Sequence, residues 1–312
     1  MNDGWTVPTE SARVRLDKFL AARERLGSRG RAAEALDKGK VFVNGTEAGR
    51  ADAGVRLRAG DVVKVWMDRP GSTRRRRGAT EAGALEIVHD DNELIVVNKP
   101  AGLLTVPLER KSDAPSAYEY IEQHLRPRGK RRPMVVHRID RDTSGLVVFA
   151  KSARAQQALR EQFQRHEPER VYWAIVYGHP QPAQGTWRDD LVWDPEALIQ
   201  RRAHPSDPRR KEAVSHYRVI ETFPGASLVE IRLETGKRNQ IRIQARIRGH
   251  TLVGERRYVD GPDANRAIAF RRQALHAYRL SFRHPGDGRP LTFEAPLPED
   301  LADLLARLRR AG

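Results

Sequence analysis

The stretch HRIDRDTSG, residues 137–145, sets a polar loop between two apolar runs. Two valines precede it at 135–136 and the run LVVF follows it at 146–149, a pattern that predicts a strand, a loop and a second strand. Loops held between strands commonly carry binding and catalytic residues. This loop is therefore the first place to look for a site.

Asp140 is the candidate functional residue of the loop. It lies between Arg138 and Arg141, two cations that would keep its carboxylate ionised, and the Thr-Ser-Gly run at 143–145 can turn the chain while donating hydrogen bonds to it. An ionised, positioned aspartate can act as a nucleophile or a general base, or form half of a structural ion pair. Residue types alone leave these alternatives open and favour the structural ion pair.

Composition bounds the class of protein. A chain of 312 residues is long enough for roughly two domains that each bury a core. It has no cysteine, which excludes disulfides, thiol nucleophiles and iron–sulfur clusters, and its ten histidines show no metal-ligand spacing. The N-terminal segment lacks an apolar signal core and no run of about 18 apolar residues exists, so we expect a soluble, cytoplasmic protein without a membrane partner.

The net charge indicates the class of partner. The formal charge of +16 and the sequence pI near 10.6 favour a polyanion bound through phosphate neutralisation, with nucleic acid as the leading candidate. A membrane-surface protein is the alternative, but no basic amphipathic helix with a bulky apolar face is evident. Residues 1–80 hold 18 Lys and Arg against 10 Asp and Glu, so the front of the chain is the more basic part.

The front of the chain predicts two short helices and a small sheet. Residues 16–20 carry Leu and Phe at helical spacing, and residues 30–37 form a second helical stretch. Residues 41–43 and 61–65 have the pattern of short strands, with an Asn-Gly turn at 44–45 that is typical of a hairpin.

These front segments resemble, in this order, the S4-like RNA-binding domain of ribosomal proteins and RNA-modifying enzymes. The segments are RLDKFL (15–20), SRGRAAEALDKGKVFVNG (28–45) and LRAGDVVKV (57–65). The resemblance implies that residues 1–67 hold RNA against a basic helix face, and for each basic residue the alternative is a solvated surface charge. The implied RNA contacts are Arg15, Lys18, Arg29, Arg31 and Lys38.

Residues 68–84 separate this domain from the rest of the chain. They are rich in Gly, Ser and Thr, include four consecutive arginines at 74–77 and contain almost no apolar residue, which predicts a flexible linker able to touch phosphates. Beyond the linker, the pattern predicts two strands within 85–104, joined by a turn at 90–92, and then a helix over 116–125. A basic loop over 126–132 follows, and a second helix is predicted over 153–163. Residues 172–293 are predicted to be mostly strands, with a turn at 235–236 that leads into a helical or extended segment.

The motifs of residues 85–298 resemble the RluA-type pseudouridine synthases. The matching segments are VNKPAGLLTVP (97–107), HRIDRDTSG (137–145), RVYWAIVYG (170–178), LETGKRNQIRI (233–243) and ALHAYRLSFRHP (274–285) through APLP (295–298). The resemblance implies an α+β catalytic domain over residues 85–312, built on a mostly antiparallel mixed β-sheet flanked by helices and loops. With the S4-like front, the layout is similar to that of the members that modify ribosomal RNA.

The resemblance also implies roles for individual residues. Asp140 corresponds to the catalytic aspartate of the HRxD segment, Tyr172 to the tyrosine that stacks on the target base and can assist proton transfer, and Arg242 to the arginine that pairs with the aspartate. Arg138 corresponds to the arginine that enters the RNA and helps displace the base, and Leu233 would line the pocket. The other implied substrate-binding residues are His137, Thr143, Gly236 and Gln240.

The chain departs from the family pattern close to these residues. Asn239 stands where a histidine is usual, Gln244 replaces a later histidine and Glu255 replaces an aspartate. Arg170 and Lys237 stand where lysine and arginine, respectively, are more usual. The departures leave the three catalytic candidates in place, so they put substrate choice in question more than chemistry.

The implied reaction requires no metal or cofactor, because the base is cut from ribose, rotated and rejoined through carbon 5. Asp140 could attack the anomeric carbon, attack the pyrimidine ring or remove a ribose proton, and the sequence does not choose among these routes. All three need an ionised carboxylate close to the nucleotide, which Arg242 would favour by its opposite charge.

Two functions of other classes compete with this one. The substituted Asn239 and Gln244 motivate a non-catalytic RNA-binding ribosome-assembly factor. A hydrolase triad of His137, Asp140 and Ser144 is disfavoured, because three members on one short loop cannot easily converge and no G-x-S-x-G motif is present. We therefore predict a monomeric, cofactor-free RNA pseudouridine synthase that acts on large-subunit ribosomal RNA, with transfer RNA as the second candidate substrate.

Overall fold

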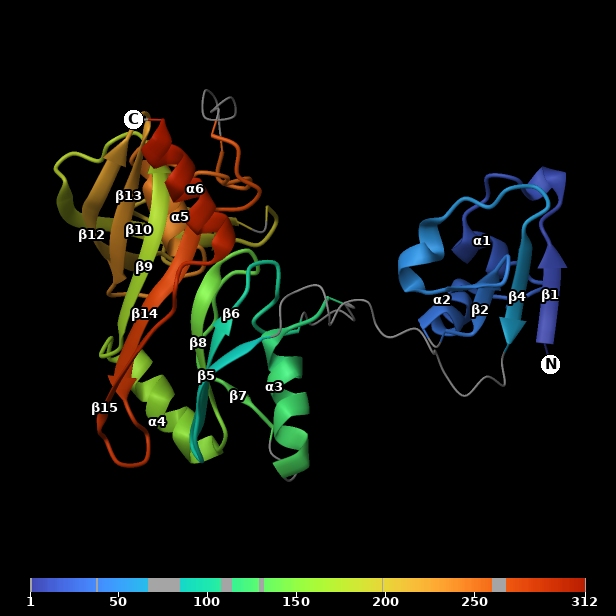
Figure 1. Cartoon of the computed structure of the whole chain (residues 1–312), viewed down its shortest axis with the longest axis horizontal. Coiled ribbons are helices and arrows are strands. Elements are labelled where there is room, and N and C mark those ends of the chain that lie inside the picture. The colour runs from blue at the N-terminus through green and yellow to red at the C-terminus, as the bar shows by residue number, and fades with distance from the viewer. Residues whose placement is uncertain are drawn as a thin grey trace. The chain divides into compact units, whose positions relative to one another are not determined.

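The computed structural model divides into two compact units, residues 1–77 and 78–312 (Figure 1). It describes residues 2–37, 39–66, 85–107, 114–128, 132–197, 199–259 and 268–311. Lys38, the predicted linker at 68–84 with its four arginines, and the centre of the predicted basic loop at 126–132 lie outside these ranges. Within the described ranges, no helix is long and apolar enough to cross a membrane.

The first unit is a four-stranded antiparallel sheet with two short α-helices. The strand order is β1-β4-β2-β3, and the β2–β3 hairpin turns at Asn44 and Gly45, whose φ values of 51° and 78° are those that an Asn-Gly pair adopts readily. Both predicted helices are confirmed, whereas the sequence pattern did not predict β1 or β3. The elements are β1 (Asn2–Thr6), η1 (Thr9–Ser11), α1 (Leu16–Leu20), α2 (Arg29–Asp37), β2 (Val41–Val43), β3 (Thr46–Ala48), η2 (Arg50–Gly54) and β4 (Val62–Trp66).

The second unit is the α+β domain that the sequence predicted. The helices predicted over 116–125 and 153–163 are confirmed within one residue at each end, and the segment after residue 236 contains a helix. The C-terminal helix was not predicted. The elements are β5 (Glu86–Asp90), β6 (Leu94–Lys99), α3 (Ala117–Leu125), η3 (Arg126–Arg128), β7 (Met134–Val135), β8 (Ser144–Ala150), α4 (Ala153–Gln164), β9 (Glu169–Tyr177), β10 (Gln184–Asp194), β11 (Ile199–Arg202), β12 (Lys211–Phe223), β13 (Ala226–Leu233), α5 (Gln240–Ile247), β14 (Leu275–Arg283), β15 (Pro290–Glu294) and α6 (Glu299–Arg310).

One long mixed sheet organises this unit. Its strand order is β11-β10-β12-β13-β9-β14-β8-β6-β5, with β7 pairing to β8 and β15 to β14. Of the strand pairs among the described residues, β8–β14 is parallel and the others are antiparallel, which confirms the predicted mostly antiparallel sheet. The polar loop at 136–143 therefore enters the sheet through β8, which is separated from β9 by β14.

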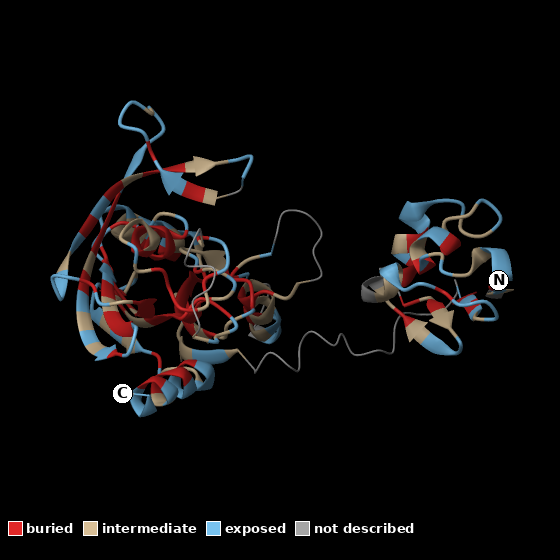
Figure 2. Ribbon diagram, turned by 90° about the horizontal axis from the view of Figure 1, so that it is seen from above, coloured by how far each residue is buried: buried red, intermediate tan, exposed pale blue. Residues whose placement is uncertain are grey.

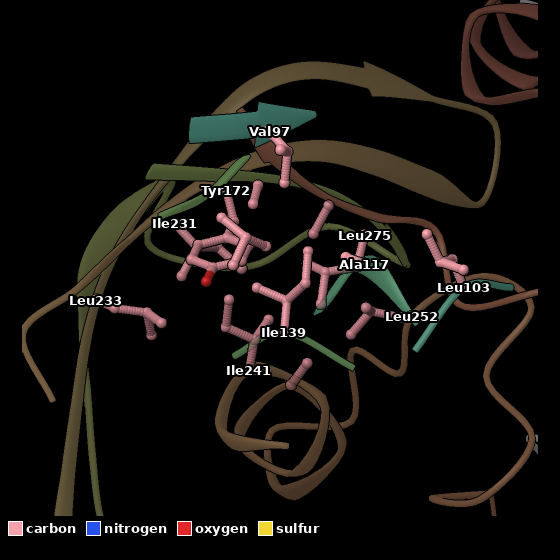
Figure 3. Close-up of a cluster of buried hydrophobic side chains, with 14 of the residues drawn as sticks. Val97, Leu103, Ala117, Ile139, Tyr172, Ile231, Leu233, Ile241, Leu252 and Leu275 are labelled. Carbon is pink, nitrogen blue, oxygen red and sulfur yellow. The ribbon is translucent and has the colours of Figure 1, made fainter. Parts of the chain in front are cut away.

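Alternate residues of the strands fill two opposite faces of the sheet. On β9, Tyr172 and Ala174 join the cluster that includes residues of α3 and α5, whereas Ile175 joins the cluster beneath α6. Figure 2 shows buried residues along the strands and α6 turning a buried stripe towards them. In Figure 3, Tyr172 lies within the first cluster together with Ile139 of the polar loop and Ile241 of α5. The core thus extends directly to the site.

The start of β8 depends on a glycine. Gly145 has φ 113°, and a Cβ atom there would lie 2.3 Å from the carbonyl oxygen of Ala277 on β14. We expect Gly145→Ala to lower the free energy of unfolding by on the order of 3 kcal/mol, because backbone strain and a backbone clash add. Gly225 is the matched control: its φ is 72° with open space around it, so Gly225→Ala should cost only about 1–2 kcal/mol in urea denaturation. Equal losses would contradict the close approach of β8 and β14.

Candidate active site

The polar loop between β7 and β8 is fixed by the last residue of β6 and by a residue that follows this strand. Lys99 is fully buried, and its Nζ donates to three backbone carbonyls, including that of Arg141 at 2.9 Å. Burial lowers the pKa of Lys99 to about 7. Thr105 Oγ1 donates to the carbonyl of Ile139 at 2.8 Å. The backbone on both sides of Asp140 is therefore anchored.

Asp140 is held through one of its two carboxylate oxygens. Its Oδ2 accepts hydrogen bonds from Arg242 Nη1 at 2.9 Å and from Asn239 Nδ2 at 2.5 Å. Its Oδ1 makes no hydrogen bond to any described residue, and the side chain is 28% exposed. The carboxylate is thus oriented by one oxygen and presents the other to the cleft.

The cation beside Asp140 comes from α5 and not from the loop. Arg242 also makes two hydrogen bonds of 2.7 Å to Glu255, whose side chain is fully buried. Burial works against the charge of Arg242, but hydrogen bonds and charge pairing with Glu255 and Asp140 raise the pKa of its guanidinium above the usual value. Burial alone would raise the pKa of Glu255, but Arg242 lowers it. Both groups therefore stay charged.

The flanking residues of the loop do not hold the carboxylate, contrary to expectation. Arg138 is exposed, and Nε of Arg141 contacts Asp142 at 3.3 Å. Thr143 Oγ1 accepts from Gln273 at 3.3 Å, and among the described residues it makes no hydrogen bond to the Asp140 carboxylate. Thr143 thus contacts a residue just before β14, and the carboxylate takes its partners from other elements.

The contacts of Ser144 also differ from the expected ones, and they rule out a hydrolase triad of His137, Asp140 and Ser144. Its Oγ contacts His276 Nδ1 at 3.0 Å, while Nε2 of His276 donates to the carbonyl of Ala295. Burial lowers the pKa of His276 to about 4, so this ring is neutral. His137 instead uses its Nε2 to accept from the backbone N–H of Val148 at 3.1 Å. The three loop residues therefore do not converge.

A second chain of hydrogen bonds holds the carboxylate of Asp140 through Asn239. Asn239 has φ 52°, a left-handed conformation that asparagine tolerates better than most residues. Its Oδ1 accepts from the hydroxyl of Tyr258 at 3.2 Å, and that hydroxyl accepts from the backbone N–H of Gln200 on β11 at 3.0 Å. The residue that departs from the family pattern is therefore part of the site.

The loop opens onto a cleft of about 1420 Å³. Tyr172, Leu233 and Arg138 line it together with Asp140. Tyr172 is 7% exposed, and burial raises the pKa of its hydroxyl, so the ring enters the cleft as a neutral phenol. An aromatic ring, an aliphatic side chain and a free carboxylate oxygen therefore face the same space.

The remaining predicted substrate-binding residues also line the cleft but are largely engaged within the protein. His137 stacks on Phe163 at 4.8 Å between ring centroids, and burial, with a contribution from the nearby Arg170, lowers its pKa to about 3. Gln240 accepts from Thr235 Oγ1 at 2.8 Å and donates to backbone oxygen on β12. Gln240 and Thr143 shape the cleft wall, and Gly236 leaves room in it.

Gln244 and Glu255, two of the departures from the family pattern, are hydrogen-bonded within polar networks. Gln244 is fully buried and bonds to Ser215 Oγ at 2.6 Å, to Asp189 at 2.9 Å and to two backbone carbonyls. It connects α5 to β10 and β12. The sequence pattern identified Asn239, Gln244 and Glu255 only as departures. For Gln244, the signal that could have revealed its role is the run of polar residues at alternate positions of α5, which need partners once buried.

Of the residues predicted to bind RNA, Lys18 lies on α1, Arg15 immediately before it, and Arg29 and Arg31 on α2. Arg15, Lys18, Arg29 and Arg31 are exposed. Arg15 makes two hydrogen bonds to Asp17, at 3.0 and 2.9 Å. The surface charges are available to a polyanion, and the weak exposed ion pair of Arg15 offers little competition.

Comparison with known proteins identifies the relatives of both units. The family model described as RNA pseudouridylate synthase matches residues 93–246, and the S4 domain model matches residues 14–63. An uncharacterized RNA pseudouridine synthase of Bacillus subtilis is 35% identical over 311 residues, with 98% of each chain covered. Ribosomal large subunit pseudouridine synthase D of Zymomonas mobilis is 37% identical over 312 residues, covering 97% of this chain and 96% of that protein.

A solved structure has the same fold. Human RNA pseudouridylate synthase domain containing 4 superposes with a TM-score of 0.61 at 22% identity, covering 74% of this chain and 97% of that one. At that level of identity the likeness concerns the fold alone. The sequence relatives carry the assignment.

Proposed function

Because the chain belongs to the RNA pseudouridine synthase family, we propose that it isomerises specific uridines of large-subunit ribosomal RNA, with Asp140 as the catalytic residue. The choice of RNA is supported by relatives named ribosomal large subunit pseudouridine synthase D, which match across nearly the whole chain. The observation that carries the catalytic assignment is the geometry of Asp140: Oδ2 is fixed by Arg242 and Asn239, Oδ1 has no hydrogen-bond partner among the described residues, and Asp140 lines the cleft.

This geometry suits the bond changes that pseudouridine formation needs. A carboxylate oxygen can attack the anomeric carbon, attack the pyrimidine ring or remove a ribose proton, and each route uses an ionised carboxylate at the nucleotide. Arg242 keeps the negative charge next to a fixed cation, and the arrangement exists before substrate arrives. Oδ1 of Asp140 is therefore the reacting atom in the proposed mechanism.

The target base must leave its stack to reach Asp140. Flipping a base costs a few kcal/mol, and stacking on an aromatic side chain such as Tyr172 returns about 1–3 kcal/mol. Arg138 is exposed at the rim of the cleft and fills the space that the base leaves, while Leu233 packs against the flipped nucleotide.

The first unit adds affinity for RNA in this proposal. We assign residues 1–67 to RNA binding through Arg15, Lys18, Arg29 and Arg31, residues 68–84 to the linker and residues 85–312 to catalysis, in a protein that acts as a monomer. Neutralising an exposed phosphate contact weakens binding uniformly and reduces its salt dependence. A substrate in the ribosome places the protein in the cytoplasm.

Tritium release tests the proposed function. Unmodified large-subunit ribosomal RNA and transfer RNA, both labelled at carbon 5 of uridine, are incubated with the wild-type protein. Tritium is expected to be released from the ribosomal RNA only, because rejoining the base through carbon 5 displaces its hydrogen. Release from transfer RNA alone would make transfer RNA the substrate. Release from neither RNA despite tight binding would favour the non-catalytic assembly factor.

Asn239 is expected to control the rate without binding substrate itself. Asn239→Ala removes a hydrogen bond to an ionised group, so the single-turnover rate should fall roughly 10- to 100-fold while RNA affinity stays unchanged. Tyr258→Phe removes the hydroxyl behind Asn239 but leaves the bond to Asp140, and its loss should be smaller. Equal rates for Asn239→Ala and wild type would show that Arg242 alone orients the carboxylate.

A further inference from the structure

Arg170, at the start of β9, is a buried cation without a carboxylate partner among the residues that the structure describes. Arg170 is only 8% exposed, and its Nη2 donates to the backbone carbonyl of Glu234 at 3.0 Å. The buried Nε has no hydrogen-bond partner. Nη1 likewise has no acceptor within the described chain, so one backbone carbonyl serves a full positive charge.

The other buried arginines of this unit are paired differently. Arg242 holds Glu255 through two hydrogen bonds, and Arg272 holds Asp300 through two bonds of 2.6 and 2.8 Å. A buried charge without a counter-charge is unfavourable, and proteins rarely keep one unless a partner arrives from outside. Burial also lowers the pKa of Arg170, which agrees with an incompletely compensated charge. The missing partner of Arg170 is therefore an anion that the described chain does not supply.

The position of Arg170 directs this charge into the cleft. Arg170 lines the cleft and stands two residues before Tyr172, on the same face of β9. Its Nη1 lies against the turn after β13, where a Cβ atom on Gly236 would be only 2.5 Å away. Gly236 thus leaves the space that the guanidinium occupies. The guanidinium is 5.6 Å from the ring centroid of Phe163, at the end of α4.

The chemistry of RNA narrows the choice of anion. Uracil offers only neutral carbonyl oxygens, which cannot compensate a buried positive charge, whereas a phosphodiester supplies a full negative charge and oxygen acceptors. Two residues along a strand are roughly 7 Å apart, so a nucleotide whose base rests on Tyr172 can reach Arg170 with its backbone. We propose that Arg170 binds the phosphate of the target nucleotide and thereby holds the flipped uridine above Asp140.

This inference rests on the proposed function and is tested on the RNA that the function requires. The probe is a synthetic RNA stem-loop spanning the uridine that the wild type converts in ribosomal RNA. One version carries a neutral methylphosphonate in place of the phosphate on the 5′ side of that uridine, and the reference carries the normal phosphate. The nucleotide before the linkage is 2′-deoxy in both, so that the two RNAs differ by one charge.

The expected result is that the two changes slow the reaction to the same extent and that their effects do not add. Arg170→Met with the normal RNA, and the wild type with the methylphosphonate RNA, should each be slowed roughly 10- to 100-fold in single-turnover rate. Arg170→Met with the methylphosphonate RNA should be no slower than either. Arg154→Met is the control. Arg154 lies on α4, is exposed, pairs with Glu93 and does not line the cleft. This variant should retain the wild-type rate and the wild-type sensitivity to the methylphosphonate.

Additive losses would overturn the assignment, because the phosphate would then have another partner and Arg170 would contact a different part of the nucleotide. Melting temperature separates binding from folding: Arg170→Met should melt at or above the wild-type temperature, since it removes an unpaired buried charge, and a marked fall would assign the guanidinium to the fold instead. If the wild type converts no uridine in any RNA, the proposed function fails. Additivity with an active wild type removes only the role of Arg170.

Discussion

Asp140→Ala should abolish pseudouridine formation, because removal of a nucleophile that acts as the centre of a catalytic unit costs on the order of a million-fold in rate. Glu255, the second carboxylate bound by Arg242, cannot replace the reacting Oδ1, since its side chain is fully buried and paired with Arg242. The measurement is tritium release under single-turnover conditions with the RNA that the wild type converts.

Asp140→Asn is the matched control for this prediction. It keeps the shape of the side chain and removes the charge, so the protein should fold and bind RNA while turnover remains absent. Binding is measured by filter retention of the same RNA at fixed salt, because affinity for RNA depends strongly on ionic strength. Measurable turnover by Asp140→Ala would refute the catalytic assignment. If a variant that no longer forms pseudouridine kept every cellular role of the protein, that would support an assembly factor.

Arg242 is expected to matter for both folding and catalysis, and a second substitution separates the two. Arg242→Met leaves Glu255 charged in a fully buried position, which should lower the free energy of unfolding by about 3–5 kcal/mol. Adding Glu255→Gln removes that buried charge and keeps an oxygen for the backbone N–H groups of Arg256, Arg257 and Tyr258. The double variant should recover most of the lost stability in urea denaturation.

Activity should not recover together with stability. In the double variant Asp140 still lacks its fixed cation, so the single-turnover rate should remain roughly 100- to 1000-fold below that of the wild type, the cost typical of losing one preorganised electrostatic group. Glu255→Gln alone is the control for the second substitution. If the stable double variant regained the wild-type rate, Arg242 would serve only to neutralise Glu255, and its pairing with Asp140 would have no catalytic value.

The elements that the sequence predicted correctly are those with a strong local pattern. The second helix of the first unit, the Asn-Gly hairpin turn, the helices beginning after Ser116 and Ser152, and the strand–loop–strand around Asp140 depend on periodicity, capping residues and turn residues that lie next to one another in the chain. Strands β1 and β3 and helix α6 were missed. The two strands are short and lack alternation, and α6 follows a stretch whose pattern was interpreted as strands and loops.

The site was predictable in its main residues only through the resemblance to a family. Residue types alone favoured a structural ion pair for Asp140, and the adjacent arginines were the obvious partners. In the structure Asp140 does form an ion pair, but with Arg242 of α5 and only through one oxygen, which leaves the other compatible with the proposed catalytic role. Neither Arg138 nor Arg141 makes a hydrogen bond to the carboxylate among the described residues: Arg138 is exposed, and Arg141 contacts Asp142.

The sequence by itself determined the basic character of the protein, the two kinds of unit and the loop that carries Asp140, because charge, periodicity and turn chemistry are properties of neighbouring residues. Tertiary structure alone decided that Asn239, 99 positions further along the chain, meets the carboxylate, that Glu255 keeps Arg242 charged, and that Arg170 has no counter-charge among the described residues. The physical reason is that the free energy of a buried charge depends on the groups that the sheet brings within a few ångströms of it. Those groups come from distant parts of the chain, so no local stretch of sequence predicts them.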